Sequence, residues 1–186
     1  MRRSAIFIVL LALLYIDSPS SAATKHQMAS QEAIEEAVFR YQMSAVPFDD
    51  TQGEIYQGRR PGFHVFFLSL KNDRDPSHRV MRCFTHHQPP VKAVSQCRRY
   101  PRPKHEGWAL SENARHNVFD KRTGQNGIIC YISHLKWLNR FSVSVEGSYY
   151  AGWVWTQGYR YTVVLNGGRW TVIGIKKTWE PPEYTA

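Results

Sequence analysis

The chain of 186 residues carries a formal net charge of +9 and is 42% hydrophobic. This length fits one domain, which can bury a core without a covalent staple. The basic balance permits contact with anionic partners such as acidic polysaccharide, phospholipid headgroups or nucleic acid, but it does not require them. The sequence contains no phosphate-cradling glycine loop, no nucleophile elbow and no paired-carboxylate spacing, which argues against the enzyme classes that depend on them.

Residues 1–23 have the three parts of a cleavable signal peptide. Two arginines follow the first methionine, residues 5–16 are apolar, and a short polar stretch ends in Ala22 and Ala23. The apolar run is shorter than the roughly 20 residues that span a bilayer, and no later segment is longer. We therefore expect cleavage near these alanines and a secreted or periplasmic protein, with an uncleaved N-terminal anchor as the alternative.

The next part of the chain predicts a helix and a strand within a single α+β domain at 30–180. A polar leader at 24–29 precedes a helix over 30–44, which has an initial serine cap and apolar residues at i, i+3, i+4 and i+7. Residues 48–62 are polar and contain glycine, so they predict a loop. The apolar run at 63–70 predicts a strand that is covered on both faces.

A short helix and a long basic excursion follow. Asp75 and the proline after it predict the start of a helix that ends near residue 84. Residues 91–97 predict a further strand. The segment 98–127 is polar, basic and without apolar periodicity, and turn residues at 120–127 are typical of a hairpin loop.

The C-terminal sixty or so residues predict a four-strand antiparallel meander. Its expected strands are 127–138, 141–156, 159–165 and 169–179. Apolar residues occupy the odd positions of 141–165, so one face is buried and the other is wet. Gly147 and Gly152 are natural sites for a kink or bulge, and residues 166–168 predict a tight hairpin turn. Prolines end the sheet before a tail at 181–186.

Several of these segments resemble the nuclear-transport-factor-2-like (cystatin-like) superfamily, and within it small secreted bacterial proteins. They are 32–41, 66–70, 75–77, 136–137, 145–150, 168–172 and 177–179. The resemblance spans residues 30–180 and implies an N-terminal helix packed on a bent, cone-like antiparallel sheet, with a pocket between them. The superfamily contains isomerases, cyclases, dehydratases, immunity proteins and binding modules without chemistry. The 98–127 excursion departs from its compact pattern.

Two histidines and one carboxylate are candidate catalytic residues. His64 and His134 lie on predicted strands, and an interior histidine can act as a general base near neutral pH. Glu146 is a candidate partner, although it lies with serines on the wet face. The alternative is that all three are structural or surface residues. A further set has zinc-ligand types at no standard spacing, so we predict no metal and no cofactor: His78, Cys83, His86 and His87.

The cysteines permit one disulfide in an oxidising compartment. Cys83 and Cys97 would close a loop of about 15 residues, worth on the order of 3 kcal/mol. Cys130 lies in an apolar strand and is expected to be buried. A bond between Cys97 and Cys130 remains the alternative.

Two groups of residues are candidates for binding. The aromatic candidates for a ligand surface, with a core position as the alternative, are Tyr150, Trp153, Trp155 and Tyr159. Tyr150 is even-numbered and is expected to point away from the core. The basic candidates for an anionic partner, with a solvated loop as the alternative, are Arg98, Arg99, Arg102 and Lys104.

These observations favour an extracytoplasmic, non-catalytic binding or interaction module for an unknown protein or small molecule, such as an immunity-type protein that blocks a toxin. The alternative function is a small lyase or isomerase that uses an interior His, Asp or Glu. The two hypotheses differ in which side chains line the concave face of the sheet.

Overall fold

The computed structural model describes residues 21–45, 63–100, 117–152 and 155–179. Its elements in chain order are α1 (Ser21–Ala45), β1 (Val65–Leu70), the 3-10 turn η3 (Lys71–Asp73), α2 (His78–Arg82), β2 (Val91–Ala93), the 3-10 turn η4 (Val94–Gln96), β3 (Cys97–Arg99), β4 (Val118–Asp120), β5 (Gly127–Asn139), β6 (Ser142–Gly152), β7 (Trp155–Asn166) and β8 (Arg169–Trp179).

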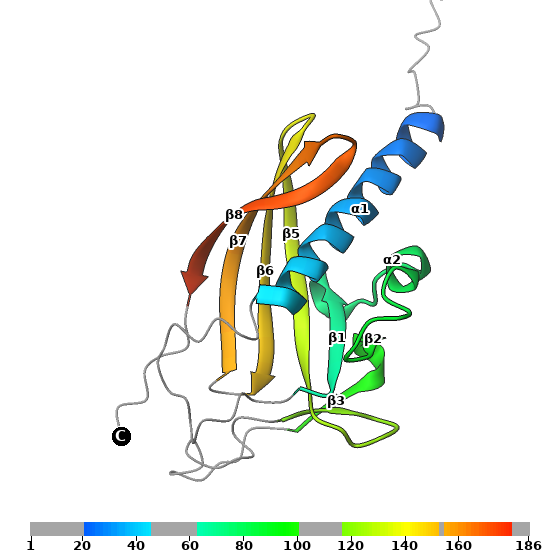
Figure 1. Ribbon diagram of the computed structural model, residues 1–186, viewed down its shortest axis with the longest axis vertical. Helices are drawn as coiled ribbons and strands as arrows, with labels where there is room; N and C mark the ends of the chain where they lie inside the picture. The colour runs from blue at the N-terminus through cyan, green and yellow to red at the C-terminus, as the bar shows by residue number, and fades with distance from the viewer. Residues whose placement is uncertain (1–20, 46–62, 101–116, 153–154, 180–186) are drawn as a thin grey trace, which may run out of the picture.

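The main sheet has six strands in the order β2-β1-β5-β6-β7-β8 (Figure 1). Strands β5 to β8 form the predicted antiparallel meander. The expectation of a wholly antiparallel sheet is wrong, because β1 runs parallel to both β2 and β5. The connection through α2 returns the chain to the starting end of β1, as a parallel pair requires. The fold is therefore α+β with a mixed sheet.

Helix α1 packs on one face of this sheet. Ile34 and Val38, four residues apart, join one buried cluster with Val145 of β6 and Tyr161 of β7. The predicted alternation of β6 and β7 is confirmed. The odd residues at 143–151 and 157–163 are all buried or partly buried. Phe141 is the exception at 50% exposed, because it belongs to the turn between β5 and β6.

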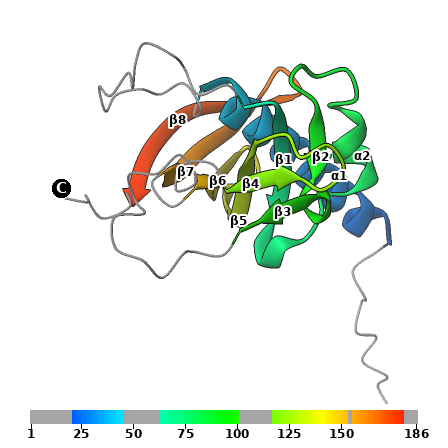
Figure 2. The ribbon, with the colours of Figure 1, turned by 90° about the horizontal axis from the view of Figure 1, so that it is seen from below.

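The opposite face, called the outer face below, is partly covered by the two-stranded ribbon of β3 and β4. Figure 2 views the molecule from the end at which this ribbon lies. Val65 and Phe67 of β1 pack there with Val118 of β4 and Ile129 of β5. All residues of β1 are buried, which confirms the prediction that this strand is covered on both faces.

Register shifts interrupt the meander at several points. Gly147 lies beside the shift between β5 and β6, and Gly152 lies at a shift between β6 and β7, where kinks were predicted. On β8, Ile173 and Thr178 are extra residues without a ladder partner on β7. The edge strand β8 is therefore broken into short regular stretches.

Several predicted boundaries are wrong. Helix α1 begins at Ser21, nine residues before the predicted cap. Helix α2 is capped by Ser77, whose Oγ accepts from the Val80 N–H, while Asp75 instead accepts from the Ser95 N–H at 2.9 Å. The predicted strand at 141–156 is divided between β6, which ends at Gly152, and β7, which begins at Trp155. Likewise, the single strand predicted at 91–97 consists of β2 and β3 joined by η4.

Some predictions fall outside the described residues. These are the signal peptide at 1–20, most of the loop at 48–62, Arg102, Lys104, Trp153 and the tail at 181–186.

Candidate functional site

Tyrosines occupy the space between α1 and the concave side of the meander. The Tyr41 ring of α1 meets Tyr161 of β7 edge-on, with ring centroids 5.9 Å apart. Tyr159 lies 6.1 Å from Tyr161 and stacks on Tyr149 of β6 at 6.1 Å. Aromatic rings thus fill the place where a superfamily pocket is expected.

Two glutamines hydrogen-bond with the hydroxyls of Tyr149, Tyr159 and Tyr161. Gln157 Oε1 accepts hydrogen bonds from the hydroxyls of Tyr149, at 3.0 Å, and of Tyr159. Gln42 Nε2 donates to the Tyr161 hydroxyl at 3.3 Å. Burial raises the pKa of both Tyr161 and Cys130. Both groups are therefore protonated at neutral pH, which suits them poorly to act as a base or nucleophile.

His64 lies outside this interior. It is exposed just before β1 and lines a shallow, open pocket of about 470 Å³ together with Phe63, Gln88, Pro89, Pro90 and Gln125. None of the other lining residues carries an ionisable side chain. This pocket therefore lacks the carboxylate partner that a His64 base would need.

His134 and Glu146 are direct cross-strand partners of β5 and β6. The structure thus brings two of the three predicted catalytic residues together on the exposed outer face. Neither of them lines the pocket that contains His64. Arg160 Nη2 donates to Glu146 Oε1 at 2.7 Å. Glu146 is therefore held in a surface ion pair, which is the arrangement that the structural alternative predicts.

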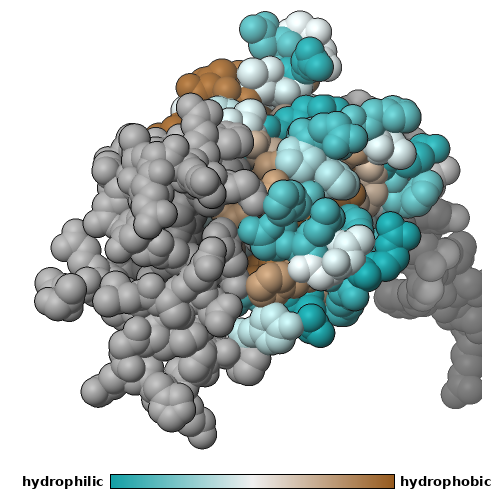
Figure 3. Space-filling model, turned by 60° about the horizontal axis from the view of Figure 1, so that its bottom comes forward, coloured by the Kyte–Doolittle hydropathy of each residue, from teal (hydrophilic) through white to brown (hydrophobic). Residues whose placement is uncertain are grey.

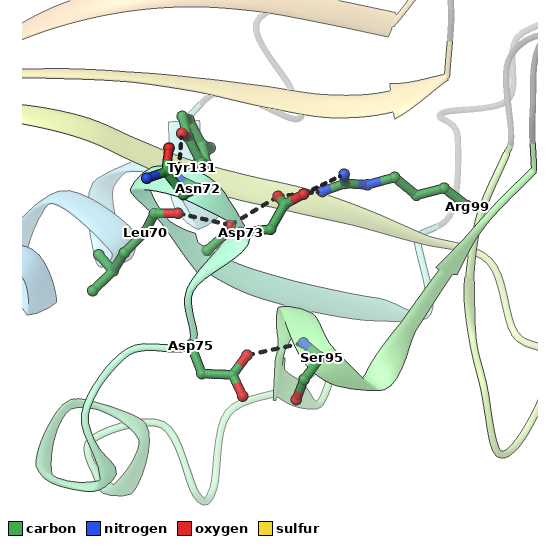
Figure 4. Close-up of polar contacts among 8 residues, drawn as sticks. Leu70, Asn72, Asp73, Asp75, Ser95, Arg99 and Tyr131 are labelled. Carbon is green, nitrogen blue, oxygen red and sulfur yellow. Dashed lines mark hydrogen bonds and ion pairs between the residues drawn. The ribbon is translucent and has the colours of Figure 1, made fainter.

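The outer face carries a cluster of polar side chains that the sequence analysis did not predict. It is built around the turn after β1 (Figure 4). Leu70 and Arg74 exchange backbone hydrogen bonds of 2.8 and 3.3 Å and close this turn. Inside it, Asn72 and Asp73 have φ values of +64° and +53°. Asn and Asp tolerate this left-handed region better than most residues, so this pair of residue types fits the turn.

Asp73 forms a two-pronged ion pair with Arg99 of β3. The Arg99 nitrogens Nη1 and Nη2 lie 2.9 and 2.8 Å from the two carboxylate oxygens. Hydrogen bonds from Arg99 lower the pKa of Asp73, and hydrogen bonding to Asp73 raises the pKa of Arg99. The ion pair ties the turn after β1 to the β3–β4 ribbon.

Three further residues complete this group. The Asn72 N–H donates to the Tyr131 hydroxyl at 3.3 Å, and Asn117 Nδ2 donates to the Tyr150 hydroxyl at 2.7 Å. The Arg99 guanidinium carbon lies 6.0 Å from the Tyr150 ring centroid. Asn117 is 1% exposed, and its Oδ1 has no partner among the described residues. The outer-face cluster is defined as Asn72, Asp73, Arg99, Asn117, Tyr131 and Tyr150.

The outer-face cluster offers hydrogen-bond donors and acceptors rather than a base. Its carboxylate is held ionised by Arg99, and burial raises the pKa of Tyr150. A binding role suits these groups better than proton transfer near neutral pH. The sequence signal that was missed is the Asn72-Asp73 pair directly after a buried strand, which is typical of a special turn.

The predicted binding residues are divided between different places. Tyr150 points to the outer face, as predicted, whereas Tyr159 is 3% exposed in the core and cannot contact a ligand. Trp155 belongs to β7. The charge of Arg99 is already matched by Asp73, but Arg98 is exposed, with its guanidinium 4.8 Å from the Tyr100 ring centroid.

All three cysteines are free thiols, so neither predicted disulfide is formed. Cys130 belongs to the cluster under α1, while Cys97 belongs to the cluster on the outer face. The sheet separates these two residues. Cys83 lies beside α1, where Arg40 donates to its carbonyl oxygen at 2.9 Å, so it also lies across the sheet from Cys97.

Of the histidines near α2, His87 is held by structural contacts, while His78 and His86 are exposed. His87 Nδ1 lies 2.8 Å from the Pro89 carbonyl oxygen, and its ring packs edge-on against Phe66 and Phe84. Within the described ranges, no three or more His, Cys, Asp or Glu side chains are grouped so that they could hold a metal ion.

Among the described helices, none is both long and apolar enough to cross a membrane. Comparisons of the chain with protein-family models, with curated proteins and with solved structures found no match.

Proposed function

We propose that the protein is a non-catalytic binding or interaction module that works outside the cytoplasm and has the cone-like arrangement of the nuclear-transport-factor-2-like superfamily. Its binding surface is the outer face of the sheet, centred on the outer-face cluster. The partner is a protein or small molecule that is recognised through hydrogen bonds.

One observation carries this proposal, namely the filled interior of the bent sheet. Tyr149, Tyr159 and Tyr161 occupy the concave side of the sheet. Gln157 accepts hydrogen bonds from the hydroxyls of Tyr149 and Tyr159, and Gln42 donates one to the hydroxyl of Tyr161. A lyase or isomerase of this arrangement needs an interior cavity with a base. The described interior holds tyrosines instead, so a surface role accounts for the molecule better.

Two further features support the fold and the location. Helix α1 lies against the concave side of a long antiparallel meander, which is the arrangement that the resemblance implies (Figure 1). The signal-peptide pattern at 1–23 supports export.

The outer-face cluster has the features of a recognition surface. The ion-paired residues Asp73 and Arg99 are 56% and 38% exposed at their side chains, so a partner can reach them without unfolding the surface. An incoming partner gains directional hydrogen bonds from such groups without reorganising them.

A pull-down from the envelope of the producing cells tests this function. Wild-type chain is compared with the double variant Asp73→Asn/Arg99→Gln, and Arg82→Gln/Arg122→Gln serves as a surface control. We expect a stoichiometric partner that is retained by the wild type and the control and lost from the Asp73/Arg99 variant, with thermal unfolding unchanged in all three.

Two results would contradict the proposal. One is that no partner is recovered at moderate salt. The other is a small molecule that shifts the ring resonances of Tyr149 and Tyr161 in NMR spectra, because such a ligand would occupy the interior.

A further inference from the structure

The two hairpin ends of the meander expose large apolar side chains at one end of the molecule. At the end of β5, Trp137 and Leu138 are 36% and 54% exposed, and Phe141 in the turn that follows is 50% exposed. On β8, Ile173 is 65% exposed. Leu138 and Ile173 are the extra residues at two register shifts, which turn them out of the regular ladder. The two hairpins touch, because the Trp137 ring meets the half-buried Trp170 of β8 edge-on at 5.6 Å.

All charged residues in the two hairpin ends are basic. Lys136, Arg140 and Arg169 are exposed, and none of them forms an ion pair within the described part of the chain. The Arg140 guanidinium lies 4.5 Å from the Phe141 ring centroid. Residues 136–142 and 164–173 contain no Asp or Glu. The hairpin tip, defined as these two segments, is therefore apolar, aromatic and positive.

The hairpin tip lies at one end of the long axis of the molecule. Figure 1 shows the first turn of α1 at the same end of the long axis as the ends of both hairpins. Viewed with the opposite end brought forward, the described residues that are visible are mainly hydrophilic (Figure 3).

We propose that the hairpin tip docks on the surface of a lipid bilayer that contains anionic headgroups. Phe141, Leu138 and Trp137 enter the boundary between headgroups and acyl chains, where aromatic residues are favoured. Arg140 and Arg169 stay at the level of the lipid phosphates, because their long stems let the charge remain in the polar layer. This inference goes beyond the proposed function, since it uses a surface separate from the outer-face cluster.

Charge complementarity selects this occupant. A second copy of the chain would bring Arg140 and Arg169 against the same residues, and like charges repel in a contact that excludes water. An anionic bilayer matches both the positive charge and the apolar side chains of the hairpin tip.

The decisive experiment measures where the tip lies when the full chain meets vesicles. In a Cys83→Ser background, Phe141→Cys is labelled with an environment-sensitive nitrobenzoxadiazole dye, and the matched control carries the dye at Arg122→Cys in the turn after β4. Both chains are mixed with vesicles of phosphatidylglycerol and phosphatidylcholine in equal parts, and with vesicles of phosphatidylcholine alone.

We expect the emission of the dye at position 141 to move to shorter wavelength with the anionic vesicles and to be quenched by spin-labelled lipid, while the dye at position 122 stays in water. No shift at 141, or equal shifts at both positions, overturns the proposal. A chain held to vesicles only by residues 5–16 would leave the dye at 141 unshifted, so that outcome is also distinguished.

A second pair of variants tests how much the basic residues of the hairpin tip contribute to vesicle binding. Arg140→Gln/Arg169→Gln should weaken partition into anionic vesicles about 30-fold, since each basic residue near such a surface contributes about a fivefold factor. The control Arg82→Gln/Arg122→Gln removes the same charge elsewhere and should partition like the wild type. Equal weakening in both variants would show that net charge alone drives binding, and would overturn docking by the tip.

Discussion

The side-chain nitrogen of Gln42 lies 3.2 Å from the carbonyl oxygen of Tyr131, so α1 is hydrogen-bonded directly to the backbone of the sheet. The same nitrogen lies 3.3 Å from the carbonyl oxygen of Ser148 on β6. Gln42 can reach both oxygens because Gly147 has no side chain. A Cβ at Gly147 would lie 2.5 Å from the Tyr131 oxygen and 3.0 Å from Gln42 Nε2.

Replacing Gly147 with Ala should therefore destabilise the fold. Because the nearest atom is backbone, the strands or α1 must move, and overpacking of this kind typically costs about 1–3 kcal/mol. Urea unfolding measures the loss. The matched control is Gly174→Ala, where a Cβ would lie 3.7 Å from Thr162 in ordinary contact and the stability should change little. Equal effects at both glycines would contradict this account.

Replacing Asp120 with Asn should destabilise the protein by about 3 kcal/mol or more, because it leaves the half-buried Lys92 ammonium unpaired. Burial alone would raise the pKa of Asp120, but hydrogen bonds from Lys92, the Arg122 N–H and Thr123 outweigh it and lower the pKa to about 2. Restoration of stability by adding Lys92→Met would identify the unpaired charge as the cause.

The same pair predicts a pH dependence. Since the pKa of Asp120 is lower in the folded chain than its ordinary value of 3.8, the pair stabilises the fold fully above that value. Its contribution is lost as the pH falls toward about 2. The difference in unfolding free energy between wild type and Asp120→Asn should accordingly shrink over this range. A constant difference would contradict the ion-pair explanation.

Replacing Glu35 with Gln should stabilise the protein at neutral pH. Glu35 of α1 is 5% exposed, and burial raises its pKa, partly offset by a hydrogen bond from Gln31. A raised pKa means that stability falls as the pH rises above the ordinary value of 4.5, because the buried group must ionise. The gain from Gln should disappear near pH 4, and a gain that is constant with pH would contradict this account.

Only Cys83 should react quickly with a thiol reagent in the folded protein. Cys83 is exposed, whereas Cys97 and Cys130 are buried. Ellman's reagent should titrate one thiol per chain at neutral pH and all three after unfolding without reductant. Burial and the neighbouring Glu36 raise the pKa of Cys83, so its reaction should be slower than that of a free thiol and should accelerate with pH. A single thiol after unfolding would reveal a disulfide.

The sequence predicted best the parts of the fold whose pattern is local. Strict alternation defined the buried face of β6 and β7, and glycines in the right places marked the shifts near Gly147 and Gly152. The turn between β6 and β7 was missed because aromatic residues continue the alternation through Trp153 and Trp155. A period-2 pattern cannot distinguish one long strand from a hairpin of two.

Contacts between distant segments were not predictable from one sequence. The parallel pairing of β1 with β5 joins residues about sixty positions apart, and no local signal encodes it. The outer-face cluster draws Asp73, Arg99 and Asn117 from three separate elements. The disulfide prediction failed for the same reason, since loop length is visible in a sequence but the intervening sheet is not.

The interrupted edge of the meander bears on how readily β8 could pair with a second chain. β8 ends the main sheet, and its extra residues Ile173 and Thr178 leave only 174–177 as a regular stretch between the two register shifts. Amyloid spines need regular segments of about six or seven residues. Within that short stretch, Lys176 and Lys177 add charge that repels a second identical strand. The long strand with alternating apolar residues is in this way a poor template for cross-β growth.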